Sequence, residues 1–392
     1  MKHMLIRLSS YLRNIYYSLK YYLTFIFTKP NENYILFDSY SGLNFNDNPK
    51  AIFDKLLTSN KKIVWVFKDT DLINFFNKNY PEYTAIKYNS LKHYYYLNKC
   101  KYWIFNYKTP TYFKKRKGIT FIQTWHGIPL KKLGCDIEDN GQKFYRSQQS
   151  YQQMCQSYKN EAKKCDYFIA PSKYAKEKFI SSFNLDKKKI IETQYPRNDK
   201  LLNYQEKDII SIRKKLNIDN NKKVILYAPT WRDNNSTFLK GYQEVQLLDF
   251  NKLVQLKDDY IILYRPHYLI SEKVDLTTLK KFIIDVSQYQ EINDLYLISD
   301  LLITDYSSVY FDYSLLKRPI YFYMPDLSTY KDNLRGFYID IDTDLPNDYY
   351  TTTDSLLEAI NSNYVNLEKQ HNFYSNNVFY SLDYEIILNK LK

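Results

Sequence analysis

The sequence predicts an α/β protein with two consecutive doubly wound domains, each built on a parallel sheet. Short apolar runs that suit buried strands alternate with helical patterns along most of the chain. The alternation stops in a polar stretch from about residue 195 to residue 223 and then restarts. Polar side chains directly follow several of the runs, and strand ends are where α/β sheets place ligand chemistry. We therefore expect functional residues at the carboxyl edges of two sheets.

Composition favours a folded protein with an anionic partner. The chain has 392 residues, 44% of them hydrophobic, and this length suggests two or three domains. Its net charge of +13 fits a phosphorylated substrate, an acidic membrane surface or a nucleic acid. No recognised nucleic-acid motif accompanies the charge, so we expect no nucleic acid. The four cysteines lack C-x-x-C spacing, and we expect neither zinc nor a disulfide framework, as in a reducing cytosol.

Residues 1–30 predict a basic amphipathic helix. Basic residues are frequent there, and no acidic residue occurs before Glu32. The apolar positions that share one side at helical spacing are Leu5, Leu8, Leu12, Ile15, Leu19, Leu23 and Ile26. Such a helix suits an anionic membrane surface, and the frequent tyrosine and phenylalanine favour that interpretation. The alternative is a helix that packs on the protein's own core. No apolar run is long enough to span a bilayer.

We expect residues 31–200 to form the first α/β domain and residues 201–392 the second. The predicted strands of the first are 34–37, 63–67, 102–105, 119–123 and 167–170, with a turn at 39–42 and a helix from Asn48 to Leu57. Those of the second are 223–228, 260–264, 282–285, 301–304 and 319–323. We expect the segment from Asp354 onward to form helices that cross back to the first domain.

The first candidate site follows the predicted strand 119–123. The residues after it include Trp125, His126, Gly127, Ile128, Pro129, Lys131 and Lys132. Histidine exchanges a proton near neutral pH, and glycine lets the backbone approach a ligand. The lysines supply charge for a phosphate or lie on a solvated face. A lone histidine after a strand is often a hydrogen-bonded structural residue, so both interpretations of His126 stay open.

The second candidate site lies where three predicted strands of the second domain end. The polar residues at these ends are Thr230, Trp231, Arg265, Pro266, His267, Ser307 and Ser308. Arginine binds phosphate oxygens with two hydrogen bonds. Serines at the start of a helix cap it or bind an anion there. Asp312, about one turn further on, would bond a sugar or alditol hydroxyl or a neighbouring loop.

Several strings occur in order over roughly residues 34–340. They are Ser39-Tyr40-Ser41-Gly42 with Asp47-Asn48-Pro49, Thr124-Trp125-His126-Gly127 with Pro129 to Gly134, Tyr195-Pro196-Arg197-Asn198-Asp199, Tyr227 to Arg232, Arg265-Pro266-His267, Asn293 to Tyr296, Thr304 to Ser308, and Arg335 to Tyr338. As a set they resemble the CDP-glycerol glycerophosphotransferase family, the teichoic acid primases and polymerases of Gram-positive bacteria.

The resemblance implies two facing Rossmann-like domains of glycosyltransferase-B type. It also implies transfer of glycerol phosphate or ribitol phosphate from a CDP-alditol to a lipid-linked acceptor, with release of CMP, at the inner face of the membrane. His126 and His267 correspond to the family's catalytic histidines. The donor-binding positions would be Trp125, Gly127, Ile128, Pro129, Arg197, Thr230, Trp231, Arg265, Pro266, Ser307, Ser308 and Asp312. One departure is Gln194, where the family usually has glycine, and this puts the donor's identity in doubt.

From these residues we expect His126 to act as general base on the acceptor hydroxyl. Lys131 and Lys132 would meet the diphosphate of a polyprenyl-diphosphate-linked saccharide acceptor. No carboxylate pair has metal-ligand spacing, so we expect no metal and no cofactor. One alternative is a nucleotide-sugar glycosyltransferase of the same fold in capsule or cell-envelope synthesis. Another is a binding module that uses only the positive charge. The alditol, the primase or polymerase role, and the oligomeric state stay open.

Overall fold

The computed structural model describes residues 2–139, 141, 149–230, 236–237, 241–243, 248–266, 270–272, 276–328 and 336–392, with the side chains of 2–11, 236–237, 241–243 and 270–272 not described. The chain divides into two compact units. The first comprises Met1–His126, Leu133–Arg197 and Phe379–Lys392, and the second comprises Gly127–Lys132 and Asn198–Val378. The chain therefore changes unit directly after His126, and its C-terminal end returns to the first unit.

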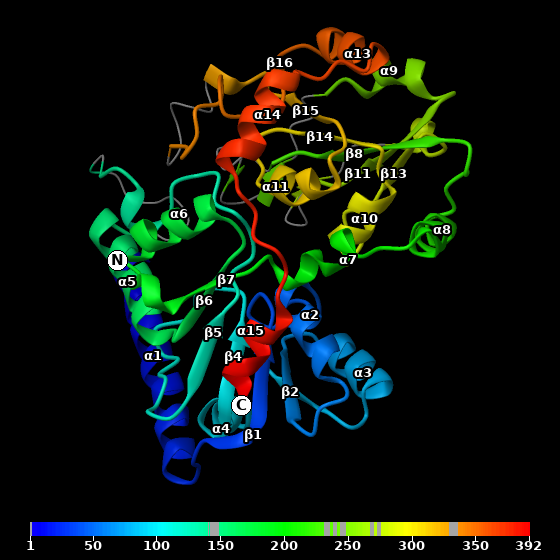
Figure 1. Ribbon diagram of the computed structural model, residues 1–392. Helices are drawn as coiled ribbons and strands as arrows, with labels where there is room; N and C mark the ends of the chain where they lie inside the picture. Colours follow the sequence, from blue (N-terminus) through cyan, green and yellow to red (C-terminus); the bar gives the residue numbers. More distant parts are fainter. Residues whose placement is uncertain are drawn as a thin grey trace. The chain divides into compact units, whose positions relative to one another are not determined.

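The first unit holds, within its described residues, a seven-stranded sheet in which all neighbouring strands are parallel (Figure 1). Its strands are β1 (Asn31–Asp38), β2 (Lys62–Phe67), β3 (Thr84–Lys87), β4 (Cys100–Phe105), β5 (Thr120–Gln123), β6 (Tyr167–Ala170) and β7 (Ile190–Glu192). Their order is β3-β2-β1-β4-β5-β6-β7, and Ile35 of β1 pairs with Ile63 and Tyr102 of its two neighbours. β1, β4 and β5 are thus adjacent, so the loops that follow them lie at one edge.

Helices cover both faces of this sheet. They are α1 (Lys2–Ile26), α2 (Asp47–Leu56), α3 (Thr70–Asn79), α4 (Leu91–Lys99), α5 (Tyr151–Lys164), α6 (Lys173–Phe183) and α15 (Tyr384–Leu388). Because parallel crossovers are right-handed, α2 and α3 cover one face, and α4, α5 and α6 the other. Phe53 of α2 and Phe76 of α3 accordingly pack on the Trp65 ring of β2. Burial of these aromatic rings is the main stabilising contribution to this layer.

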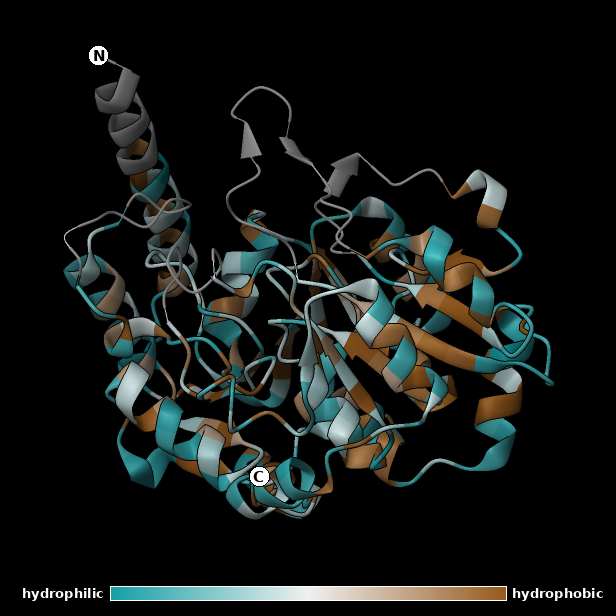
Figure 2. Cartoon of the chain, turned by 90° about the horizontal axis from the view of Figure 1, so that it is seen from above, coloured by the Kyte–Doolittle hydropathy of each residue, from teal (hydrophilic) through white to brown (hydrophobic). Residues whose placement is uncertain are grey.

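The second unit is also a parallel sheet with helices. The strands are β8 (Lys223–Ala228), β11 (Tyr260–Tyr264), β13 (Ile283–Asp285), β14 (Leu301–Thr304), β15 (Ile320–Tyr323) and β16 (Tyr349–Tyr350), in the order β13-β11-β8-β14-β15-β16. A small second sheet contains β9 (Ser236–Thr237), β10 (Gly241–Gln243) and β12 (Ile270–Glu272). The helices are α7 (Asp199–Leu202), α8 (Glu206–Lys215), α9 (Phe250–Leu253), α10 (Ile292–Ile298), α11 (Val309–Tyr313), α13 (Thr353–Asn361) and α14 (Leu367–Asn376). Figure 2 shows the apolar character of the strands against the mixed character of the helices.

The α1 helix packs on α4 with its tyrosine and threonine side. Tyr21, Thr24 and Thr28 are buried, and the Asn98 side chain on α4 donates to the Thr24 hydroxyl at 3.0 Å. The leucine side of α1 is largely exposed instead, with Leu19 and Leu23 at 63% and 52% exposure. The apolar side of α1 therefore does not pack on the core of its own unit. Among the described residues, no helix is both long and apolar enough to cross a membrane.

The structure confirms the predicted α/β class with two parallel sheets and corrects one expectation. Cys135 and Cys155 form a disulfide, although their spacing in the sequence gave no sign of it. The pair forms because the short 3-10 helix Gly134–Asp136 packs on α5, which brings the two Cα atoms to 4.4 Å. Cys100 and Cys165 are buried thiols.

Candidate functional site

The turn after β5 has an unusual backbone. Trp125 is buried and has φ = 53°, a conformation that is rare for a bulky residue and costs on the order of 1–3 kcal/mol. Its amide donates to Gln123 Oε1 at 3.1 Å, and its carbonyl accepts from Asn48 Nδ2 at 3.0 Å. Gln123 is oriented in turn by Glu161 of α5, whose Oε1 accepts from Gln123 Nε2 at 2.9 Å. Buried side chains thus hold the strained turn that carries His126.

His126 keeps solvent-exposed surface although protein atoms surround it closely, and its ring has a defined orientation. Nδ1 lies 2.5 Å from the carbonyl oxygen of Asn106, the first residue after β4. A carbonyl only accepts, so Nδ1 carries the proton and Nε2 of the neutral ring is the basic atom. The ring stacks on Trp125 with centroids 4.4 Å apart and lies 5.7 Å from the Tyr40 ring. The structure therefore leaves the basic nitrogen on the side away from Asn106.

Neighbouring groups lower the pKa of His126 below its usual value. Desolvation by the surrounding atoms is the main cause, and the Arg197 guanidinium acts in the same direction. The Asn106 carbonyl and the Asp47 carboxylate favour the protonated ring and oppose the shift. The net result is a neutral imidazole at pH 7, the form that accepts a proton.

Arg197 is bound within the first unit by an ion pair. Its Nη1 lies 2.8 Å from Asp47 Oδ1 and donates to the His126 carbonyl at 2.9 Å. Its amide donates to Asn48 Oδ1 at 3.1 Å. Both charged side chains of the pair are nearly buried, and Tyr40 donates to the other Asp47 oxygen. Arg197 therefore fixes the backbone of the histidine turn, and its contact with the donor stays a prediction from the sequence.

The loop after β1 completes this edge. Tyr40, Ser41 and Gly42 all have positive φ, and a Cβ at Gly42 would lie 3.0 Å from the Lys68 backbone nitrogen. Only glycine fits there without a shift of the backbone. The buried Asp38 carboxylate accepts from the Gly42 amide and the Tyr107 hydroxyl, both at 2.6 Å. Burial raises the pKa of Asp38 to about 7 despite these bonds.

The carboxyl edge of the second sheet brings together three of the predicted loops. β11, β8 and β14 are adjacent and parallel, so Thr230, Arg265 and Ser307 follow neighbouring strands at one edge. The Thr230 amide donates to the buried Asp305 at 2.7 Å. Arg265 Nη1 donates to the carbonyls of residues 286 and 289 at 3.0 and 2.8 Å. These bonds fix the guanidinium plane at the sheet edge.

Ser308 occupies the position before α11, as predicted, but its side chain makes no capping bond. Ser307 and Ser308 are half-buried. A Cβ at Gly127 would lie 3.4 Å from Ser308 Oγ, so the glycine backbone approaches this hydroxyl closely. Asp312 is buried and accepts from Asn198 Nδ2 at 2.8 Å. Asp312 thus contacts a neighbouring loop, and its predicted bond to a donor hydroxyl stays a prediction.

The segment Gly127–Lys132 belongs to the second unit. Ile128, Pro129 and Leu130 are buried, and Lys131 forms a β-bridge with Phe337. The Lys132 amide donates to the Gly336 carbonyl at 3.0 Å. Pro266 is buried at the end of β11. Two predicted site residues, Trp231 and His267, lie outside the described residues. Within the described part of the chain, no group of three or more His, Cys, Asp or Glu residues could hold a metal ion.

Sequence reasoning did not assign site roles to the residues that hold the histidine turn. Four of them could have been found from the sequence, because each is a polar residue at the end of a predicted element. Asp47 and Asn48 begin a helix, whereas Asn106 follows an apolar strand and Gln123 ends one. Glu161 had no such signal, since an acidic residue within the α5 pattern reads as a solvated position. It is buried because the first sheet places Thr109 and Gln123 beside it.

Comparisons with known proteins agree with this architecture. The family model "CDP-Glycerol:Poly(glycerophosphate) glycerophosphotransferase" matches residues 20–383. A teichoic acid poly(glycerol phosphate) polymerase of Bacillus spizizenii is 42% identical over 88% of this chain and 87% of its own length. A teichoic acid glycerol-phosphate transferase of Staphylococcus aureus is 41% identical over 84% of both chains. A solved structure of the wall teichoic acid polymerase TagF is 34% identical, with a TM-score of 0.83 over 100% of this chain and 97% of that chain.

Proposed function

Because the chain belongs to the CDP-glycerol:poly(glycerophosphate) glycerophosphotransferase family, we propose that it transfers glycerol phosphate from CDP-glycerol to an acceptor hydroxyl and releases CMP. The glycerophosphotransferase class follows from the family. The choice of glycerol over ribitol is supported by the two relatives above 40% identity, whose names specify glycerol phosphate. A TagF crystal soaked with CDPG supports the same donor. The product would be a teichoic acid chain or a related cell-surface polymer.

The arrangement of His126 carries the mechanistic part of the proposal. The acceptor oxygen attacks the β-phosphorus of CDP-glycerol, and the bond between this phosphorus and the bridging oxygen breaks as CMP leaves. The proton of the acceptor hydroxyl passes to His126 Nε2, because Nδ1 is committed to the Asn106 carbonyl. A lowered pKa keeps this nitrogen unprotonated at neutral pH. Such proton transfer raises a reaction rate by a factor of about 10²–10⁴.

The second sheet edge supplies the donor site in this proposal. Arg265, Ser307 and Ser308 would hydrogen-bond the pyrophosphate oxygens and stabilise the charge that CMP carries away. Thr230 would contact the same donor, held by Asp305. Lys131 and Lys132 would meet the diphosphate of the acceptor. His267 stays a prediction from the sequence, as the second histidine that assists CMP departure.

We further propose a lipid-linked acceptor and attachment at the cytoplasmic face of the membrane. The support is the exposed leucine side of α1 together with the basic residues of its sequence. Flotation of the full chain with vesicles tests the attachment. We expect binding to phosphatidylglycerol vesicles and little binding to phosphatidylcholine vesicles. Equal recovery with both compositions, or none with either, would contradict it.

Donor profiling tests the reaction. The full chain would be incubated with a lipid-linked acceptor analogue and CDP-glycerol, CDP-ribitol, or a UDP- or GDP-sugar. We expect CMP release with CDP-glycerol at least tenfold faster than with CDP-ribitol, and no UDP or GDP. Faster turnover of CDP-ribitol would overturn the choice of alditol. Release of UDP or GDP would instead support the nucleotide-sugar glycosyltransferase alternative.

A further inference from the structure

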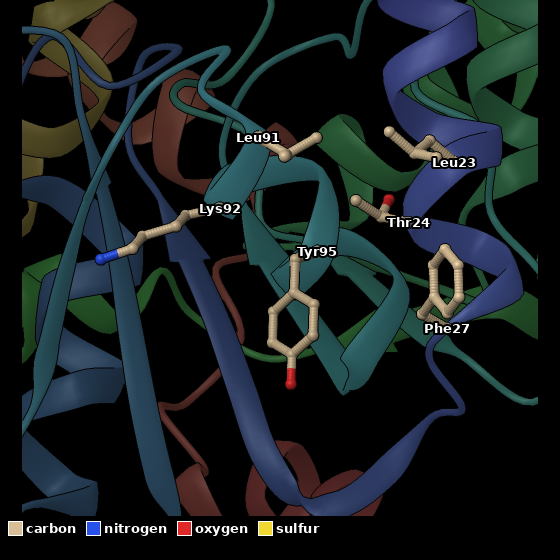
Figure 3. Close-up of a pocket in the computed structure, with 6 residues that line it drawn as sticks. All are labelled: Leu23, Thr24, Phe27, Leu91, Lys92 and Tyr95. Atoms are coloured by element: carbon tan, nitrogen blue, oxygen red, sulfur yellow. The ribbon is translucent and has the colours of Figure 1, made fainter.

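An apolar groove of about 390 Å³ lies between α1 and α4, within the first unit. Its lining residues are Leu23, Thr24, Phe27, Leu91, Lys92 and Tyr95. Figure 3 shows the three α1 residues across from Leu91 and Tyr95 of α4, with the Lys92 ammonium turned away from them. None of the roles proposed above uses this groove.

The polar atoms of the groove walls are turned to partners outside it. The Thr24 hydroxyl donates to the Tyr21 carbonyl at 3.0 Å and accepts from Asn98. The Tyr95 hydroxyl accepts from Lys99 Nζ at 2.8 Å. The walls therefore present methyl groups, methylene groups and aromatic carbon, which suit a hydrocarbon chain and offer little to a polar ligand.

The groove opens on an exposed apolar surface. Leu23 and Phe27 of α1 are 52% and 77% exposed, and Leu91 of α4 is 51% exposed. Leu19 and Ile26 continue the same side of α1 at 63% and 74% exposure. A contiguous surface of this kind marks contact with another apolar body. The groove is thus continuous with the proposed membrane surface.

The two helices that form the groove carry charges of one sign. No aspartate or glutamate occurs before Glu32, or between Glu82 and Asp136, and these stretches contain α1, α4 and the loop after β4. Lys20, Lys92 and Lys99 lie on the two helices that form the groove. Lys114 Nζ donates to the Tyr22 hydroxyl at 2.7 Å, which adds a cation beside α1. An anionic head group complements this setting.

We propose that the groove binds one acyl chain of an anionic phospholipid, with the head group at the surrounding lysines. This inference rests on the proposed membrane attachment and adds a discrete lipid site to it. A lipid held in this way adds a fixed point of contact with the bilayer to the contact made by the apolar side of α1.

Calorimetry with monomeric, short-chain dihexanoyl phosphatidylglycerol tests the site on the full chain, in the absence of a bilayer. We expect saturable binding of one lipid per chain, at least tenfold tighter than that of dihexanoyl phosphatidylcholine. Leu23→Glu places a carboxylate in the groove and should weaken this binding at least tenfold. Leu19→Glu, the matched control on the same exposed side but outside the groove, should change it less than twofold.

Vesicle flotation of the same two variants separates this inference from the attachment on which it rests. Both carboxylates lie on the apolar side of α1, so both should reduce vesicle binding. If both variants weaken lipid-monomer binding equally, or if no saturation occurs, the groove assignment is overturned while attachment stands. If neither variant changes flotation, attachment through the apolar side of α1 is overturned.

Two other occupants give distinct results. Tighter binding of farnesyl phosphate than of the short-chain phosphatidylglycerol would replace the phospholipid by a prenyl chain. A fall in molecular mass for Leu23→Glu but not for Leu19→Glu, measured by light scattering, would replace it by a second copy of the chain. Either result would overturn the phospholipid assignment.

Discussion

The carboxyl edges of the two sheets differ in how they hold their functional side chains. In the first unit, Trp125 and three loop residues from Tyr40 to Gly42 have positive φ, and buried polar side chains brace the turn. In the second, Ser307 and Ser308 are half-buried beside a short helix. The first edge orients one proton-accepting histidine through a braced turn. The second edge presents several hydrogen-bond donors that suit an anion. In the proposed mechanism, the two sheet edges therefore have different chemical roles.

The largest expected effect comes from removal of the proton acceptor. His126→Ala should lower kcat for CMP release about 10³-fold, within the range for loss of a general base, without loss of fold. His371→Ala is the matched control, because His371 is exposed on α14 of the other unit, and it should retain full activity. If His126→Ala kept a tenth of the wild-type turnover, the base assignment would be wrong.

A smaller effect is expected when the hydrogen bonds that brace the turn are weakened but His126 is kept. Asn48→Asp keeps the oxygen that accepts from the Arg197 amide and loses the donor to the Trp125 carbonyl. We expect kcat to fall about tenfold while KM for CDP-glycerol stays within twofold, measured by initial rates. Circular dichroism checks that the variant is folded. A rise in KM with unchanged kcat would show that Asn48 serves the donor site instead.

The opposite pattern should follow a change at the second edge. Gly127→Ala places a methyl group about 3.4 Å from Ser308 Oγ, in ordinary contact and therefore tolerated by the fold. The methyl group would obstruct a phosphate at this hydroxyl, so KM for CDP-glycerol should rise severalfold with little change in kcat. Titration with donor at fixed acceptor concentration measures both constants. A fall in kcat with unchanged KM would contradict the assignment of donor binding to the second edge.

The last effect concerns stability, with no change expected in activity, and applies to the first unit alone. The folded-state pKa of Asp38 is about 7, above its unfolded value of about 4, so the folded protein binds the proton more tightly. This contribution to stability is complete below pH 4 and is lost as the pH rises to 7, with a slope of at most about 1.4 kcal/mol per pH unit.

Asp38→Asn should remove that slope. The test is chemical unfolding between pH 5 and pH 8, followed by the fluorescence of Trp65 and Trp103, which are fully buried in the first unit. The wild-type protein should lose more stability than Asp38→Asn over this range. Parallel pH dependence in the two proteins would contradict the raised pKa.

Much of the fold was predictable from residues that are close together in the sequence. Apolar runs such as 223–228 and 260–264 predicted buried strands with nearly the observed bounds. β3 and β7 escaped prediction, because Thr84–Lys87 and Ile190–Glu192 are too short to form a recognisable apolar run. A parallel sheet stabilises them through neighbours that are distant in the sequence.

The candidate site shows the same limit. His126 was identifiable because it lies in the turn just after a strand. The contributions of Asn106 and Glu161 depend on strand order and on the packing of α5, which no local pattern encodes. The disulfide between Cys135 and Cys155 was missed for this reason too.

The central claim is that the two sheet edges have separate roles. Its most direct test is the affinity of His126→Ala for CDP-glycerol, measured by calorimetry. If the first edge transfers the proton and the second holds the donor, the Kd should stay within twofold of the wild-type value although CMP release is lost. A Kd that rises by as much as the turnover falls would contradict the account, because His126 would then be a donor-binding residue and not the base.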